Sequence, residues 1–357
     1  MKILSQQDTG LSDLIAHYCI SNEKKPLLIQ GDALSILKKI PDQSIDCVMT
    51  SPPYWQQREY ESGGLGQENT REQYIVSLLE ICSQIKRVLK DTGSFWLNLN
   101  DTYSKKQLSA IPWRVAITLM DEQGWTLRNS IIWNKLKGGM NSSTDRLSNI
   151  HENIFHFVKK ASGYYYNVDA IRSNPRQTVV KNGAVISATG VSGVRYKRRI
   201  ELSTALNEEE KINAFSSLDS ILKDVSNGKI SDFRMVIRDQ HRATHSDSEK
   251  LSGRARELRD KGFYFLKYNP KGSKPSDVWE IAPEDAHKRG SHFAPYPEDV
   301  CIIPILSTCP SNGIVLDPFV GTGTTTAVAY KLGFKSIGVD LSKAYLRSAK
   351  KRTELSI

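Results

Sequence analysis

The sequence has 357 residues, of which 39% are hydrophobic, and a formal net charge of +10. Its apolar runs are too short to span a bilayer, its first residues lack the apolar core of a signal peptide, and its five cysteines form no C-x-x-C pair. We therefore expect a cytoplasmic protein without a metal site, a disulfide framework or a membrane partner, whose basic balance favours a polyanion.

The first predicted strand and helix of the fold start near residue 26. Residues 26–30 form an apolar strand, Gly31 and Asp32 close it, and a short helix begins at Ala33. Asp32 suits the N-cap of that helix, because its carboxylate can accept a hydrogen bond from a free backbone N–H.

A polar and aromatic segment follows the next predicted strand, residues 45–49. It contains Ser51, Pro52, Pro53, Tyr54 and Trp55. Open α/β sheets bind their ligands at the carboxyl ends of strands. The Ser51 hydroxyl and a carbonyl held by the rigid prolines can accept protons from an amino group, and the aromatic side chains offer faces for stacking. The segment therefore predicts a site for a planar substrate that carries an amino group.

Helices and strands continue to about residue 160. The helices are expected at 74–90 and 111–123, and the strands at 94–99, 125–133 and 151–159.

Residues 161–275 have a different texture. Periodicity is poor there, and basic residues interleave with aromatic ones, as in 194–199 and the aromatic run 263–265. Such a composition is typical of a region that contacts phosphates and base edges, although it also fits a plain solvated subdomain. Glu208 to Glu210 are expected to start a solvated helix that points away from any nucleic acid.

A glycine-rich turn joins two predicted strands near the C-terminal end of the sequence. The first strand ends at Asp317, the turn contains Gly321 and Gly323, and the second strand ends at Asp340. This arrangement is typical of a nucleoside site, because glycines let the backbone approach the ligand and the second acid can bind ribose hydroxyls.

The residues around this turn decide between ligands. Thr324 stands where a phosphate-binding loop needs lysine, and Thr326 is a poor substitute for the third small residue of a dinucleotide site. S-adenosyl-L-methionine fits better, since it has an adenosine but no pyrophosphate and its positively charged amino-acid end can face Asp317.

Taken together, the Ser51–Trp55 segment and the Asp317–Thr326 turn resemble the amino-methyltransferases of DNA. The order, with the proline segment first and the glycine turn far behind it, is similar to the permuted beta class. The resemblance implies an α/β fold with a doubly wound, mostly parallel sheet. Residues 1–160 would form its catalytic half, 276–357 its cofactor half, and 161–275 an inserted target-recognition region.

The resemblance also implies roles for individual residues. Ser51, Pro52, Pro53 and Tyr54 would be the catalytic residues: the Ser51 hydroxyl and the Pro52 carbonyl would accept the substrate amine's protons, and Tyr54 would stack on a base flipped out of duplex DNA. S-adenosyl-L-methionine would be bound by Asp32, Ala294, Asp317, Phe319, Gly321, Gly323, Thr325 and Asp340. A second role for Asp32, contact with the cofactor's adenine amino group, is compatible with helix capping.

The target atom and the partners are less constrained. In related enzymes, Ser at the first position of the tetrad Ser51–Tyr54 usually accompanies methylation of cytosine N4, and Asp or Asn there usually accompanies methylation of adenine N6. We therefore expect cytosine N4 as the target atom, with adenine N6 as the alternative. A methyltransferase of RNA or protein amides and a non-catalytic DNA-binding protein are further alternatives. A cognate restriction endonuclease is an expected partner, and the sequence leaves monomer and homodimer open.

Overall fold

The structure is a computed structural model that describes residues 3–57, 64–137, 143–181, 184–238, 253–284 and 296–355. The chain divides into two compact units, residues 1–170 with 276–357, and residues 171–275. The chain leaves the larger unit after Ala170 rather than at residue 160. Backbone hydrogen bonds hold the intervening segment there: Tyr165 N–H donates to Thr92 O at 2.8 Å and Asn167 N–H to Ser307 O at 2.7 Å.

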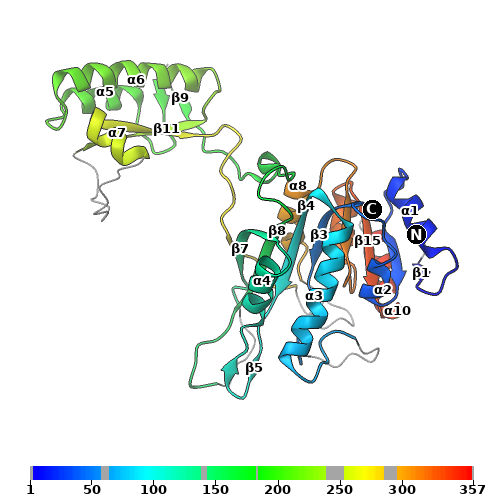
Figure 1. The fold of residues 1–357 in the computed structure, drawn as a ribbon. Helices are drawn as coiled ribbons and strands as arrows, with labels where there is room; N and C mark the ends of the chain where they lie inside the picture. Colours follow the sequence, from blue (N-terminus) through cyan, green and yellow to red (C-terminus); the bar gives the residue numbers. More distant parts are fainter. Residues whose placement is uncertain are drawn as a thin grey trace. The chain divides into compact units, whose positions relative to one another are not determined.

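The larger unit is built on one nine-stranded sheet (Figure 1). In sheet order the strands are β1 (Ile3–Ser5), β2 (Leu27–Gln30), β15 (Lys335–Asp340), β14 (Ile314–Asp317), β3 (Ile45–Thr50), β4 (Leu89–Leu99), β8 (His151–Val158), β7 (Thr126–Asn134) and β13 (Val278–Glu280). Neighbouring strands are parallel from β1 to β4, and β13 is parallel to β7. Only β8 is antiparallel to both of its neighbours, β4 and β7, among the strands of this described sheet. The expected α/β fold with a mostly parallel sheet is confirmed.

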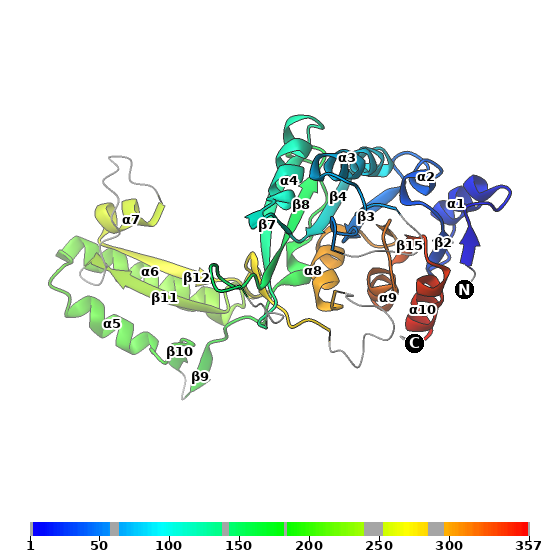
Figure 2. The same cartoon turned by 90° about the horizontal axis from the view of Figure 1, so that it is seen from below.

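Helices cover both faces of this sheet (Figure 2). One face carries α1 (Leu11–Ile20), α2 (Ala33–Leu37), α3 (Arg71–Val88) and α4 (Ile111–Asp121), and the other carries α8 (Asp299–Thr308), α9 (Thr324–Lys331) and α10 (Lys343–Glu354). The helix α3 shows why the sequence folds this way: Leu78, Cys82 and Ile85 recur at helical spacing and are buried, and the Thr70 and Gln73 side chains form a capping box.

A short hairpin, β5 (Tyr103–Ser104) and β6 (Gln107–Leu108), precedes α4. In the part of the chain that the structure describes, every helix is too short or too polar to cross a membrane.

The second unit has a hydrophobic core of its own. It contains the hairpin β9 (Val179–Lys181) and β10 (Ala184–Ile186), the helices α5 (Gly193–Glu201), α6 (Glu208–Ser226) and α7 (Gly253–Lys261), and the antiparallel pair β11 (Asp232–Ile237) and β12 (Phe263–Tyr268); the 3₁₀ turn η1 (Val168–Ile171) leads into it. Helix α6 begins where the acidic run predicted a helix start, with Asn207 as its cap. Tyr196 and Phe263, from the segments in which basic and aromatic residues interleave, are buried in the core of this unit and so are not available for nucleic-acid contact.

Candidate active site

Several strand ends lie on one edge of the large sheet. Because β2, β15, β14, β3 and β4 are parallel, their carboxyl ends share this edge. The strand β8 runs the other way, so its first residues lie there as well, with Asn153 paired to Leu99 of β4. The tetrad Ser51–Tyr54, which follows β3, therefore lies near residues from the beginning of β8.

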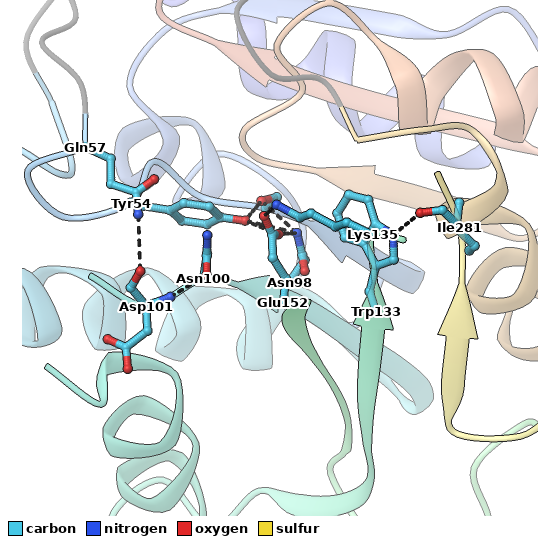
Figure 3. Close-up of polar contacts among 10 residues, drawn as sticks. Tyr54, Gln57, Asn98, Asn100, Asp101, Trp133, Lys135, Glu152 and Ile281 are labelled. Carbon is cyan, nitrogen blue, oxygen red and sulfur yellow. Dashed lines mark hydrogen bonds and ion pairs between the residues drawn. The ribbon is translucent and has the colours of Figure 1, made fainter. Parts of the chain in front are cut away.

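Four side chains make a compact hydrogen-bond cluster at this edge (Figure 3). The Tyr54 hydroxyl lies 3.0 Å from Ser51 Oγ and donates to Glu152 Oε2 at 2.7 Å. The Asn98 Nδ2 atom lies 3.2 Å from Ser51 Oγ, 3.0 Å from Tyr54 Oη and 2.7 Å from Glu152 Oε2. Burial, followed by the charge of Glu152, raises the pKa of Tyr54 well above its usual value of 10, so the phenol stays protonated.

The carboxylate in this cluster is nearly inaccessible to water, since Glu152 is 5% exposed. Its other oxygen, Oε1, is paired with Lys135, whose ammonium also lies 5.2 Å from the centre of the Trp133 ring (Figure 3). A buried carboxylate needs such a counter-charge and a full set of donors. The sequence reasoning singled out none of Asn98, Lys135 and Glu152 as candidate site residues.

The two prolines are held by the helix behind them. The Tyr74 hydroxyl, from α3, donates to the Pro53 carbonyl at 2.9 Å. Because that carbonyl is engaged, the Pro52 carbonyl is the better candidate to accept a substrate proton.

The expectation that Trp55 stacks on a substrate is wrong. Trp55 is 6% exposed, packs in the core between α3 and the sheet, and donates its indole N–H to the Glu68 carbonyl at 2.9 Å. An indole that is buried on its faces and satisfied at its nitrogen stabilises the turn instead.

Asp317 connects the tetrad strand with the glycine turn. Its Oδ1 atom accepts hydrogen bonds from Thr50 Oγ1 at 2.6 Å and from the Phe319 N–H at 3.0 Å. Its Oδ2 atom accepts from Thr325 Oγ1 at 2.5 Å and Tyr296 Oη at 3.1 Å. The residue is 1% exposed, and burial raises its pKa despite these four donors. A direct contact with a ligand's ammonium would require one of the donors to move.

The glycine turn has a backbone conformation and a close helix contact that require glycine. Gly321 and Gly323 have φ values of 51° and 85°, which L-residues rarely adopt. A Cβ atom on Gly323 would lie 2.5 Å from the Cβ atom of Ala349 in α10. Asp340 Oδ2 accepts the Gly321 N–H at 3.0 Å, and its Oδ1 accepts the Ser342 N–H at 2.7 Å. Burial raises the pKa of Asp340 to about 6.

The remaining candidates differ in what the structure shows of them. Asp32 caps α2 as predicted, with its carboxylate accepting the Ser35 N–H at 2.9 Å. Phe319 is partly buried beside the core, and Thr325 is fully buried. Ala294 lies outside the described residues.

A family model described as DNA methylase matches residues 45–351, a span that includes both the tetrad and the glycine turn. The chain belongs to the DNA methylase family. This family includes enzymes directed at N6 and at N4 amino groups. Membership therefore establishes that the chain is a DNA methyltransferase, but it does not establish which amine the enzyme methylates. S-adenosyl-L-methionine is the cofactor of this methylase.

Relatives match this methylase over nearly its whole length. It is 30% identical to the Type II methyltransferase M.SfiI of Streptomyces fimbriatus, over 89% of this chain and 89% of that protein. It is 26% identical to the Type II methyltransferase M.SmaI of Serratia marcescens, over 93% of this chain and 92% of that protein. Among solved structures, the PvuII DNA methyltransferase (cytosine-N4-specific) shares the fold, with a TM-score of 0.55 and 16% identity over 92% of this chain and 86% of that one.

Proposed function

We propose that this DNA methylase transfers a methyl group to the N4 amino group of a cytosine flipped out of duplex DNA. The observation that carries the proposal is the Ser51 hydroxyl, which lies at the carboxyl end of β3 within the cluster of Tyr54, Asn98 and Glu152. A hydroxyl at this position is a neutral acceptor. Adenine N6 is the alternative, because its amine makes the same kind of hydrogen bonds.

The chemical problem is the weak nucleophilicity of the amine. Its lone pair is conjugated with the base, so the site must favour the geometry in which the lone pair leaves the ring plane. The Ser51 hydroxyl and the Pro52 carbonyl would accept the two amine protons and so stabilise the positive charge that develops on nitrogen. The Tyr54 ring would stack on the base, with its hydroxyl anchored to Glu152 at 2.7 Å.

The chain also offers a fitting cofactor site. The glycine turn carries no side chain at Gly321 and Gly323, and Asp340 provides a carboxylate at the strand end that accepts hydrogen bonds from two backbone N–H groups. We assign the ribose hydroxyls to Asp340 and the adenine amino group to Asp32. Asp317, Phe319 and Thr325 would shape the site for the amino-acid end, and Ala294 is expected to contact it. When bound, S-adenosyl-L-methionine would supply an electrophilic methyl on a sulfonium and leave as the neutral thioether, and the methylated amine would release its proton to water.

The unit of residues 171–275 is proposed to recognise the DNA sequence. Its helix α5 carries Arg195, Lys197, Arg198 and Arg199, side chains of the kind that neutralise phosphates. We further propose that the enzyme acts beside a restriction endonuclease, an expectation drawn from relatives that are Type II methyltransferases.

The test is transfer of labelled methyl to unmethylated duplex DNA, followed by digestion to nucleosides. We expect label in N4-methylcytosine with the parent enzyme and none with Ser51→Ala, while Ser51→Ala still binds the cofactor. Label in N6-methyladenine would overturn the N4 assignment and leave the methylase activity in place. Unchanged transfer by Ser51→Ala would overturn the role of the tetrad.

A further inference from the structure

The hydrogen bonds of the cluster around Ser51 all run in one donor-to-acceptor direction, which follows from what each group can donate or accept. The Glu152 carboxylate only accepts, and it is ion-paired with Lys135 through its other oxygen. The Tyr54 hydroxyl, 2.7 Å from Glu152 Oε2, must therefore donate its single proton to that oxygen. A protonated phenol has no second proton to give to Ser51.

The Ser51 hydroxyl must therefore donate to Tyr54. The two oxygens lie 3.0 Å apart, a distance at which one of them donates, and the Tyr54 proton is already committed. The Asn98 amide supports the same direction. Its Nδ2 atom, rather than its oxygen, must face Glu152 at 2.7 Å, because two oxygens at that distance would repel, and this places an N–H 3.2 Å from Ser51 Oγ.

After these bonds Ser51 Oγ has one lone pair left. Its proton is used by Tyr54, and one lone pair faces the Asn98 N–H. What the hydroxyl can still offer a substrate is an acceptor and never a donor. An isolated hydroxyl can rotate either to donate or to accept a hydrogen bond. The restriction of Ser51 to accepting therefore comes from its neighbours in the cluster.

We infer that Glu152 is a positioning residue that holds Ser51 as a hydrogen-bond acceptor and thereby makes the site select bases with an exocyclic amine over bases with a carbonyl in its place. The inference rests on the proposed function and deepens it. It applies to cytosine against uracil and equally to adenine against hypoxanthine. Lys135 contributes to this arrangement, because it is the ion-pair partner of the buried carboxylate.

The substitution Glu152→Gln should reverse the direction of the hydrogen bonds in the cluster with almost no change in the shape of the side chain. The ammonium of Lys135 would hold the new amide oxygen, so the new NH₂ group would face Tyr54 and Asn98. Tyr54 would then accept, its own proton would point to Ser51, and the Asn98 amide would turn its oxygen toward the new NH₂ group. The Ser51 proton would be released from Tyr54, so Ser51 would no longer be restricted to accepting. In the double variant Glu152→Gln, Lys135→Met the amide can turn over, with its oxygen toward Tyr54, and the original direction is restored.

The experiment measures equilibrium binding of two duplexes to each enzyme in the presence of S-adenosylhomocysteine. The duplexes differ only at the mapped methylation position, which carries the amino base in one and its carbonyl counterpart, uracil or hypoxanthine, in the other. In both duplexes this position stands opposite an abasic site, so that neither base loses a pairing partner when it flips. We expect the parent to bind the amino duplex about tenfold or more tightly than the carbonyl duplex, the difference that an unpaired buried polar group produces. Glu152→Gln should lose or invert this ratio at unchanged cofactor affinity, and the double variant should recover part of it.

Two results would overturn the inference: a parent that does not discriminate, or a Glu152→Gln enzyme that keeps the parent ratio. Equal loss of binding to both duplexes in Glu152→Gln, with no recovery in the double variant, would show a merely structural role and also overturn it. Transfer to adenine instead of cytosine would refute the N4 proposal alone, since the adenine and hypoxanthine pair then gives the same test.

Discussion

Cofactor binding should depend on pH through Asp340. Burial raises the pKa of this carboxyl to about 6, and the carboxylate accepts hydrogen bonds from the N–H groups of Gly321 and Ser342. Ribose hydroxyls would donate to the ionised form, so the proposed complex favours a charged Asp340. The sign follows: below about pH 6 the carboxyl must lose a proton before the cofactor binds, and affinity falls as pH falls.

The magnitude can be worked out from that value. With a pKa of about 6, roughly one Asp340 in eleven is ionised at pH 5 and nearly all are at pH 8. If the cofactor binds the ionised form alone, its apparent dissociation constant should be about tenfold larger at pH 5 than at pH 8. Asp340→Asn removes the titrating group, so its affinity should be weak and nearly flat over the same range.

Isothermal titration with S-adenosyl-L-methionine at pH 5, 6, 7 and 8 would measure this dependence. Asp317 is another carboxyl of this site whose pKa is raised, and its charge adds to the rise at Asp340, so Asp317→Asn should move the loss of affinity to lower pH without abolishing it. A parent whose affinity does not change, or an Asp340→Asn variant that keeps the tenfold change, would refute the reasoning.

Three further predictions concern the supports of the site. Gly323→Ala should lower the free energy of unfolding in urea by about 2 kcal/mol or more and abolish cofactor binding, because the new Cβ would meet α10. The control Gly333→Ala, with φ of 82° but open space at its Cβ, should cost only about 1 kcal/mol and leave cofactor binding intact. Equal losses of stability in the two variants would contradict the role of the contact with α10. Thr50→Val removes one buried donor from the carboxylate that ends β14 and should lower unfolding free energy by about 1–2 kcal/mol; an unchanged urea midpoint would count against that bond. Tyr74→Phe removes the hydrogen bond to the Pro53 carbonyl and should lower kcat severalfold with little change in KM for the cofactor. A change in that KM with kcat unaltered would contradict a role of this bond in positioning the tetrad.

The parts of the fold that local patterns specify could be predicted. Strand β3 and helix α3 are marked by apolar periodicity, and the glycine turn by residues that tolerate positive φ. Asp32 was expected as a cap, and the structure has it as one. Such features depend on a few neighbouring residues, which the sequence displays directly.

The partners of Ser51 depend on strand direction, which no local pattern reveals. Glu152 stands at the start of β8, and in a parallel strand that end would lie on the opposite edge of the sheet. Only because β8 is antiparallel to β4 does Glu152 reach the tetrad. One signal was present: Asn98 interrupts the apolar run of β4, and a polar side chain inside a buried strand needs a partner.

Size and aromaticity alone could not separate core from surface. Trp55 and Phe263 were both assigned to ligand or DNA contact, and both are buried. In α6 the buried residues Ala214, Leu218 and Ile221 do recur at helical spacing, so the second unit's core was visible in the sequence beneath its many charges.

The position of β14 and β15 has a consequence for how the protein is made. These two strands come from the last part of the described sequence, yet they lie between β2 and β3, which are consecutive along the chain. A ribosome that has released only the first 300 residues has produced β2 and β3 without the two strands that join them, so their places in the sheet are about 14 Å apart with nothing between. The Thr50–Asp317 bond and the glycine turn can therefore form only after the C-terminal strands emerge. Synthesis itself thus delays assembly of the site, and loss of the final strands would remove the centre of the sheet rather than its edge.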